Sequence, residues 1–353
     1  MIDFFIKVKQ QEAQHLPFVI YRKPYEKVLR GLFQKNDHLY FADTLNEKGF
    51  VFAPFTGSQK ILIPKNQSVI WETETTSLDE DNHVGLIDLN NSEDKEHFEN
   101  LIQKGIDAIK KGIIKKVVLS RKEILDVPDF DLVTVFTRLI NRYPTVFCYC
   151  WYHPKIGLWM GATPELLLKA SRRKFCTMAL AGTQNFNKKT DVSWGSKELE
   201  EQQFVTDYIL DNIKGLTSEV SISSPYTINT GNVLHIKTDI EGVINRNSKL
   251  NQVVDVLHPT PAVCGLSKED AKNFILENED YNREYYTGFL GELNRKGFFD
   301  IMSKSDLYVN LRSMQIKDKK AYLYVGCGIT KDSVPENEWK ESVNKSMTMK
   351  SIL

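Results

Sequence analysis

The chain has 353 residues, of which 41% are hydrophobic and 26% are charged, which is typical of a globular protein. Its 46 basic and 46 acidic residues give a formal net charge of zero, so no overall field favours nucleic acid or an anionic membrane, and we expect neither partner. The five cysteines form no CxxC pair and no apolar run approaches the roughly 20 residues of a membrane span, which indicates a cytoplasmic protein with reduced thiols.

Short runs of aromatic and β-branched residues alternate with turns over residues 1–70. Residues 18–21, 49–53 and 61–64 are such runs, and we predict that they form strands. Residues 72–96 are polar and acidic, which predicts an exposed connection and makes this segment the best candidate for an internal boundary.

An amphipathic helix is predicted to begin at residue 91 or 92 and to end at Gly112, because apolar residues recur between them at helical spacing. The other predicted elements are a strand over 116–121, a hairpin over 147–152 and 157–161, helices over 196–214 and from 336 onward, and strands over 233–240 and 321–325. The elements follow no regular strand–helix–strand rhythm. Spacing alone therefore indicates only a protein of mixed helices and strands.

Two Glu-x-x-Glu pairs lie on predicted helices, Glu198 with Glu201 and Glu338 with Glu341. A spacing of three places both carboxylates of a pair on one helix face. Two such faces brought together make an oxygen-rich site that suits magnesium. The alternative is an ordinary solvated helix face, because glutamate is common on helix surfaces.

Lys116 and Glu165 stand beside apolar runs. A lysine buried there loses affinity for its proton and becomes a base, whereas a lysine at a solvated strand end does not. A carboxyl group in apolar surroundings keeps its proton and becomes an acid. For Glu165 the alternative is the start of a helix or turn, with Thr163 as the cap.

Three further features suggest an anion site or a rigid turn. Gly326 and Gly328 lie on either side of Cys327, directly after an apolar run. Glycines let the backbone approach a ligand closely. Arg312 lies in an apolar, strand-like run and needs an acidic partner or an anionic ligand. Residues 258–265 contain two prolines, which predicts a rigid, irregular segment.

Several short segments follow one another in a distinctive order. They are Lys-Val-Val-Leu-Ser-Arg at 116–121, Gly-Ala-Thr-Pro-Glu-Leu-Leu-Leu at 161–168, Leu-Ala-Gly-Thr at 180–183, His-Pro-Thr-Pro-Ala-Val-Cys-Gly at 258–265, Val-Gly-Cys-Gly-Ile at 325–329, and Glu-Trp-Lys-Glu-Ser at 338–342 with Lys345. This order resembles the chorismate-utilising enzymes, which include isochorismate, salicylate, anthranilate and aminodeoxychorismate synthases.

The resemblance implies an α+β fold, a single large domain of stacked antiparallel sheets with pseudo-symmetric halves and outer helices. The whole chain, 1–353, would form one chorismate-binding domain, with residues 1–91 as a variable part and 92–353 as the motif-bearing catalytic part.

Within the family, Lys116 and the 258–265 segment resemble the branch that adds water to chorismate, the isochorismate synthases. The product would serve menaquinone or siderophore biosynthesis. A salicylate synthase is the alternative, an ammonia-using synthase is disfavoured by Lys116, and a non-catalytic relative would be expected to lack one of the key residues. We expect no amidotransferase subunit, and a monomer.

The resemblance also implies roles for individual residues. Lys116 would be the general base and Glu165 the general acid, with Mg²⁺ held by Glu201 and Glu341 and supported by Glu198 and Glu338. The residues implied to bind chorismate are Gly182, Thr183, His235, Tyr286, Arg312, Gly326, Gly328 and Lys345. Relatives often have histidines beside the first magnesium glutamate. This chain has none there, and the neighbouring Glu200 leaves the choice of ligand open.

Overall fold

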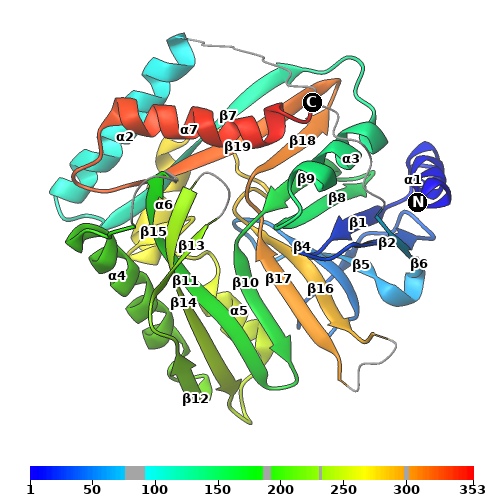
Figure 1. Ribbon diagram of the computed structural model, residues 1–353, viewed down its shortest axis with the longest axis horizontal. Helices are drawn as coiled ribbons and strands as arrows, with labels where there is room; N and C mark the ends of the chain where they lie inside the picture. Colours follow the sequence, from blue (N-terminus) through cyan, green and yellow to red (C-terminus); the bar gives the residue numbers. More distant parts are fainter. Residues whose placement is uncertain (76–91, 186–191, 230–232, 298–301) are drawn as a thin grey trace.

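The fold is that of a computed structural model, which describes residues 1–75, 92–185, 192–229, 233–297 and 302–353. The strands form two sheets in which every pairing between neighbours is antiparallel (Figure 1). The nine-stranded sheet has the order β15 (Gly265–Leu266), β7 (Lys116–Asp126), β19 (Lys320–Ile329), β18 (Ser313–Lys317), β9 (Gly157–Thr163), β8 (Phe147–His153), β1 (Phe18–Arg22), β2 (Val28–Gln34) and β6 (Ser68–Glu74).

The ten-stranded sheet contains the remaining strands. Its order is β12 (Thr217–Ile222), β14 (Val233–Ile244), β11 (Lys174–Asn185), β10 (Leu166–Ser171), β17 (Lys304–Val309), β16 (Phe289–Arg295), β4 (Gly49–Ala53), β5 (Ile61–Pro64) and β3 (Tyr40–Phe41), with β13 (Tyr226–Asn229) paired to β14. The helices are α1 (Ile2–Ala13), α2 (Ser92–Lys110), α3 (Leu132–Arg142), α4 (Ser196–Ile213), α5 (Leu250–Leu257), α6 (Lys268–Asn278) and α7 (Pro335–Lys350), with a short 3₁₀ helix η1 (Lys65–Gln67).

An aromatic core lies between the two sheets. Phe52 of β4 lies 4.7 Å from the ring of Trp151 on β8 and stacks on Tyr285 at 4.3 Å between ring centroids. Trp159 of β9 packs edge-on against the same phenylalanine. Because these side chains come from both sheets and are buried, the sheets pack face to face.

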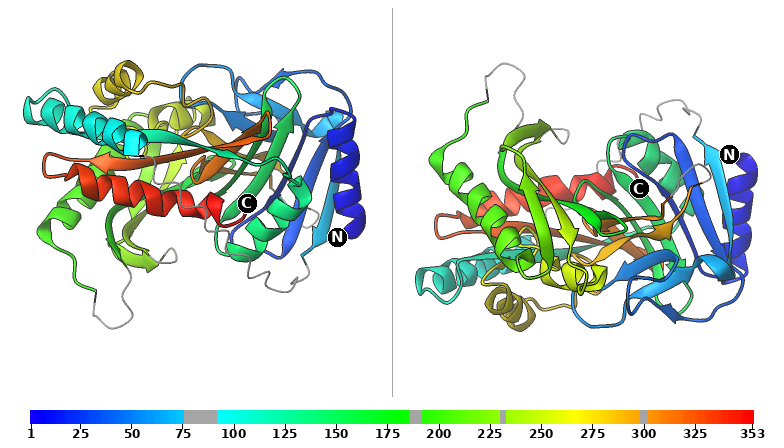
Figure 2. Two further views of the ribbon diagram at one scale, coloured as in Figure 1. Left: turned by 90° about the horizontal axis from the view of Figure 1, so that it is seen from above. Right: turned by 90° about the horizontal axis from the view of Figure 1, so that it is seen from below.

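Helices cover the outer faces of the sheets (Figure 2). α1 and α3 share one apolar cluster with β1, β8 and β9, and α2, α6 and α7 share another with β7 and β19. α4 and α5 cover β10, β11 and β14 of the other sheet. The predicted α+β fold of stacked antiparallel sheets with outer helices is confirmed. None of the helices in the described part of the chain is long and apolar enough to span a membrane.

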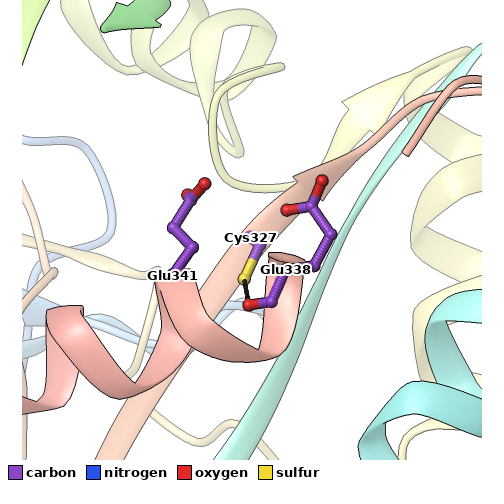
Figure 3. A group of neighbouring side chains, drawn as sticks. All are labelled: Cys327, Glu338 and Glu341. Carbon is purple, nitrogen blue, oxygen red and sulfur yellow. Dashed lines mark hydrogen bonds between the residues drawn. The ribbon is translucent and has the colours of Figure 1, made fainter. Parts of the chain in front are cut away.

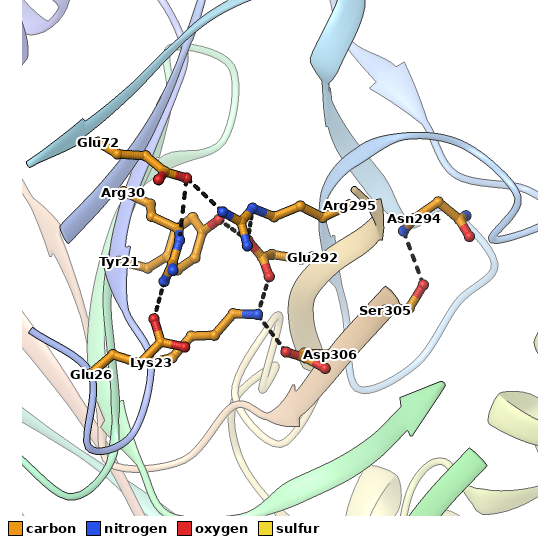
Figure 4. A network of polar contacts seen from close by, with 10 residues as sticks. All are labelled: Tyr21, Lys23, Glu26, Arg30, Glu72, Glu292, Asn294, Arg295, Ser305 and Asp306. Atoms are coloured by element: carbon orange, nitrogen blue, oxygen red, sulfur yellow. Dashed lines mark hydrogen bonds and ion pairs between the residues drawn. The ribbon is translucent and has the colours of Figure 1, made fainter. Parts of the chain in front are cut away.

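A buried ion-pair network also joins the two sheets (Figure 4). Lys23, next to the end of β1, pairs with both Glu292 of β16 and Asp306 of β17. Arg295 pairs with Glu292 at 3.2 Å and with Glu72 of β6 at 2.6 Å. The N-terminal strands are therefore bonded to strands from the last quarter of the chain.

Most of the predicted elements are confirmed, including α2, α4, α7 and the hairpin of β8 and β9. The connection predicted over residues 72–96 is wrong at its start, where 72–74 belong to β6, and its last residues, 92–96, form the beginning of α2, in agreement with the helix start predicted at residue 91 or 92. The last three residues of β6, Glu72, Thr73 and Glu74, are polar and lie in an edge strand, so their composition resembles that of a loop. Residues 76–91 lie outside the described part, and the division into 1–91 and 92–353 stays a prediction.

Candidate active site

Lys116 is the first residue of β7, and its side chain is buried. Its Nζ lies 2.6 Å from Oε1 of Glu201 on α4. Gly328 of β19 borders the same lysine, since a methyl group placed there would lie 3.2 Å from Lys116 Cε. The missing side chain at Gly328 thus leaves room for the lysine to reach α4.

Glu165 lies in the connection between β9 and β10, so the alternative of a helix start is wrong. Its backbone is held by β17, because the amide of Val309 donates to the Glu165 carbonyl at 3.0 Å. The residue is 8% exposed, and burial raises the pKa of its carboxyl group to about 7. A hydrogen bond from Thr260 and the charges of Lys116 and Lys345 act in the opposite direction. A substantial share of Glu165 is therefore protonated near neutral pH, as the sequence predicts for an acid.

Lys345 of α7 joins the helix to β19. Its Nζ pairs with Glu341 Oε1 at 2.6 Å and donates to the backbone carbonyl of Gly326 at 2.9 Å. Tyr286 is buried on the other side of Gly326, where its hydroxyl lies 3.1 Å from the position of an added methyl group. Lys345 and Tyr286 thus both lie next to Gly326 of β19, where the missing side chain leaves room for the tyrosine hydroxyl.

A thiol lies beneath the carboxylates of α7 (Figure 3). The ligand atoms of Cys327, Glu338 and Glu341 all lie within 4.8 Å of one another. The Cys327 thiol donates to the backbone carbonyl of Glu338 at 3.1 Å, and burial raises the pKa of this thiol to about 12. Because only a thiolate is a strong metal ligand, the carboxylates and not the thiol are the groups of this cluster that could hold a metal ion.

Arg312 lies in the connection between β17 and β18, and not in a strand as predicted. Its backbone has a φ of +46°, a left-handed conformation that spacing patterns do not reveal. Its Nη1 donates to Thr348 Oγ1 at 3.2 Å, and no carboxylate of the described residues is within ion-pair distance. The side chain of Arg312 is only partly exposed, so an anionic ligand would complete its contacts.

His235 belongs to β14, and the charges of Lys345 and Glu341 on α7 act on it. Its Nδ1 lies 3.1 Å from the Gly182 carbonyl, which can only accept, so the ring donates from Nδ1. Burial lowers the pKa of this imidazole, which leaves it neutral at pH 7. Gly182 has a φ of +70° and borders Glu198, whose Cβ lies 3.3 Å from the position of an added methyl group. Thr183 pairs with His235 in the sheet, and its side chain lies outside the described ones.

The predicted site residues with described side chains form one connected region. It runs from Lys116 and Glu201, through Glu165, to Lys345 and Glu341, and its other members are Glu198, Glu338, Gly182, His235, Tyr286, Arg312, Gly326 and Gly328. These residues come from both sheets and from α4 and α7, which are far apart in the sequence.

The donor set of this region fits magnesium. Glu201 and Glu341 supply hard carboxylate oxygens, and each of them holds a lysine ammonium group at 2.6 Å. The carboxylates of Glu201 and Glu341 therefore both lie where a positive charge is favoured. Glu200 is exposed on the surface of α4 and forms none of these contacts, which favours Glu201 of the two candidates.

Two sets of residues next to the site are not among the predicted ones. Thr260 donates a hydrogen bond to Glu165 Oε1 at 3.2 Å. Arg283 forms a buried ion pair with Glu279 and donates to the Val118 carbonyl of β7 at 2.7 Å. For the pair of Glu279 and Arg283, the sequence offers one signal, which is the spacing of four positions between the acidic residue and the arginine.

Comparison with known proteins gives the same family as the motifs. The family model of the chorismate-binding enzymes matches residues 56–353. The isochorismate synthase EntC of Escherichia coli (strain K12) is 28% identical over 267 residues, which are 72% of this chain and 66% of the relative. The anthranilate synthase component 1 of Aquifex aeolicus is also 28% identical, over 273 residues, 73% of this chain and 53% of the relative. The chain thus spans less than two thirds of the length of both relatives.

A crystal structure of the protein DhbC from Bacillus anthracis has the same fold. It aligns with a TM-score of 0.77 at 20% identity, covering 98% of this chain and 99% of the other. Since the family model covers most of the sequence and its motifs meet in one region, the chain belongs to the family of chorismate-binding enzymes.

Proposed function

We propose that the chain is an isochorismate synthase, which reversibly converts chorismate to isochorismate. Water adds at C2 of the ring, the double bonds shift, and the C4 hydroxyl leaves as water. The observation that carries the proposal is the presence of a buried lysine, Lys116, in the same region as a buried carboxyl group with a raised pKa, Glu165. The chain is 28% identical both to an isochorismate synthase and to an anthranilate synthase, so overall similarity does not distinguish the two reactions. The proposal therefore depends on Lys116 and Glu165.

Lys116 would accept the proton of the attacking water through Nζ, for which it must be neutral. Its Nζ is held in the ion pair with Glu201. Glu201 would therefore have to release the lysine before Nζ can accept a proton from water.

Glu165 would donate its proton to the C4 oxygen as that group leaves. A pKa of about 7 suits a group that must give up a proton at neutral pH. Base and acid return to their starting states by exchanging protons with solvent, so the reaction is balanced.

Magnesium would be held by Glu201 and Glu341, with Glu198 and Glu338 in support. Once bound, it would offset the charge of the ring carboxylate. Arg312 and Tyr286 would bind the carboxylate of the enolpyruvyl arm, beside Gly326, Gly328 and Lys345. Gly182, Thr183 and His235 would line the ring. The product would be consumed in menaquinone or siderophore biosynthesis.

Product analysis tests the proposal. The purified chain is incubated with chorismate and Mg²⁺, with and without ammonium, and the products are separated by chromatography. Isochorismate in both reactions supports the proposal. Salicylate with pyruvate would identify a salicylate synthase, and anthranilate formed only with ammonium would identify an amine-adding enzyme.

A further inference from the structure

Thr260 is in direct contact with the proposed acid. It lies in the 258–265 segment, and its Oγ1 donates a hydrogen bond to Glu165 Oε1 at 3.2 Å. The contact joins parts of the chain that are 95 positions apart. The mechanism proposed above makes no use of Thr260.

The segment that carries Thr260 is fixed on several sides. The Lys268 ammonium group donates to the His258 carbonyl at 2.5 Å, and Arg283 donates to the Val263 carbonyl at 3.0 Å. The Cys264 carbonyl accepts from the amide of Val118 in β7 at 2.8 Å. The hydroxyl therefore has a set position relative to β7, the strand that also carries Lys116.

A hydroxyl donor on one carboxyl oxygen determines where the carboxylic proton lies. When Glu165 is protonated, Oε1 accepts from Thr260 as the carbonyl oxygen, and the proton is on Oε2. The charged groups that act on Glu165 are Lys116 of β7 and Lys345 of α7. Both belong to the site, so the contact with Thr260 sets the orientation of the carboxyl group within it.

We propose that Thr260 is a positioning residue that holds the Glu165 carboxyl group with its acidic proton on Oε2, toward the substrate. The inference deepens the proposed function and rests on it, since it concerns the acid of that reaction. A hydrogen bond to a carboxylate also stabilises its charged form, so Thr260 keeps the pKa of Glu165 lower than burial alone would.

The test replaces the hydroxyl by a methyl group of the same size, in Thr260→Val. We expect kcat to fall roughly 10- to 100-fold with little change in KM, because a misoriented acid affects the chemical step. The alkaline limb of the kcat–pH profile should move upward by about one pH unit. Thr260→Ser keeps the hydroxyl and should restore both values. A residue that only supported the fold would leave the pH profile in place.

A second measurement does not depend on turnover. The infrared band of the protonated Glu165 carboxyl group, identified by its loss in Glu165→Gln, is titrated in the wild type, Thr260→Val and Thr260→Ala. The inference requires the band to persist to higher pH in both variants. Unchanged titration in folded variants would overturn it, whatever reaction the chain catalyses. Failure of the proposed function would instead appear as the absence of isochorismate from the wild-type reaction.

Discussion

The Lys116 ammonium nitrogen lies 2.6 Å from the Glu201 carboxylate, and this ion pair joins β7 of one sheet to α4, which covers the other. The proposed base and a proposed magnesium ligand are thus direct partners. Lys116 is buried and Glu201 is partly exposed, so a cation bound at Glu201 would compete directly with the lysine.

Replacing Lys116 with methionine should abolish turnover while the protein stays folded. The substitution keeps the length of the side chain and removes the base, which contributes about 10²–10⁴-fold to kcat. Steady-state kinetics measures the loss, and circular dichroism checks the fold. Lys115→Met is the matched control, since Lys115 is exposed beside it. Wild-type activity in Lys116→Met would remove the assigned role.

The activity of the wild type should fall as pH rises above about 7. Glu165 must be protonated, and burial raises its pKa from 4.5 to about 7, so the active form is lost in this range. Above the pKa, kcat should drop by about tenfold per pH unit. In Glu165→Gln, most of the activity should be lost, and the remaining kcat should no longer fall as the pH rises above about 7. An alkaline limb that survives in this variant would assign it to another group.

Glu201→Gln and Glu341→Gln should each weaken magnesium binding to the free protein by about tenfold or more, because each removes a negatively charged ligand. Calorimetric titration with Mg²⁺ measures the affinity directly. Glu200→Gln is the matched control on the exposed side of α4. The reverse pattern, with weak binding only in Glu200→Gln, would make Glu200 the ligand.

Arg312→Ala should raise the KM for chorismate more than it lowers kcat. A charge-assisted hydrogen bond to a carboxylate is worth about 2 kcal/mol, which corresponds to roughly a 30-fold change. Substrate titration over a wide concentration range measures the effect, with Arg246→Ala as a control on an exposed loop arginine. An unchanged KM would show that Arg312 does not bind the substrate.

Arg283→Met should destabilise the fold strongly. It leaves the Glu279 carboxylate buried without its ion-pair partner, which costs about 3–5 kcal/mol. Urea unfolding measures the free energy. Lys340→Met, which removes an exposed pair with Glu336, should change the unfolding midpoint far less. Equal effects of both substitutions would contradict the importance of the buried pair.

Local sequence patterns predicted many of the elements but not their arrangement. The apolar spacing in α2 and α4 is repeated over several turns and survives folding, because each helix buries the face that the spacing defines. β6 was missed because an edge strand buries few side chains. No spacing pattern relates β7 to α4, since pairings between distant segments depend on the whole fold.

The site was predictable to a similar extent. The family motifs supplied the residues that the structure brings together, including Lys116 and Glu341. The sequence does not single out Thr260, because its segment has the composition of a structural turn and its partner lies 95 positions away. Hydrophobic spacing places Arg312 in a strand, because a single left-handed residue leaves no trace in such spacing.

The origin of the new hydroxyl group tests the central claim most directly. Chorismate is incubated with the enzyme and Mg²⁺ in H₂¹⁸O, and the early product is examined by mass spectrometry. The account predicts isochorismate with one ¹⁸O atom in its C2 hydroxyl, and no such product in Lys116→Met. Isochorismate without the label would contradict the addition of solvent water, and anthranilate or salicylate in its place would contradict the assigned reaction.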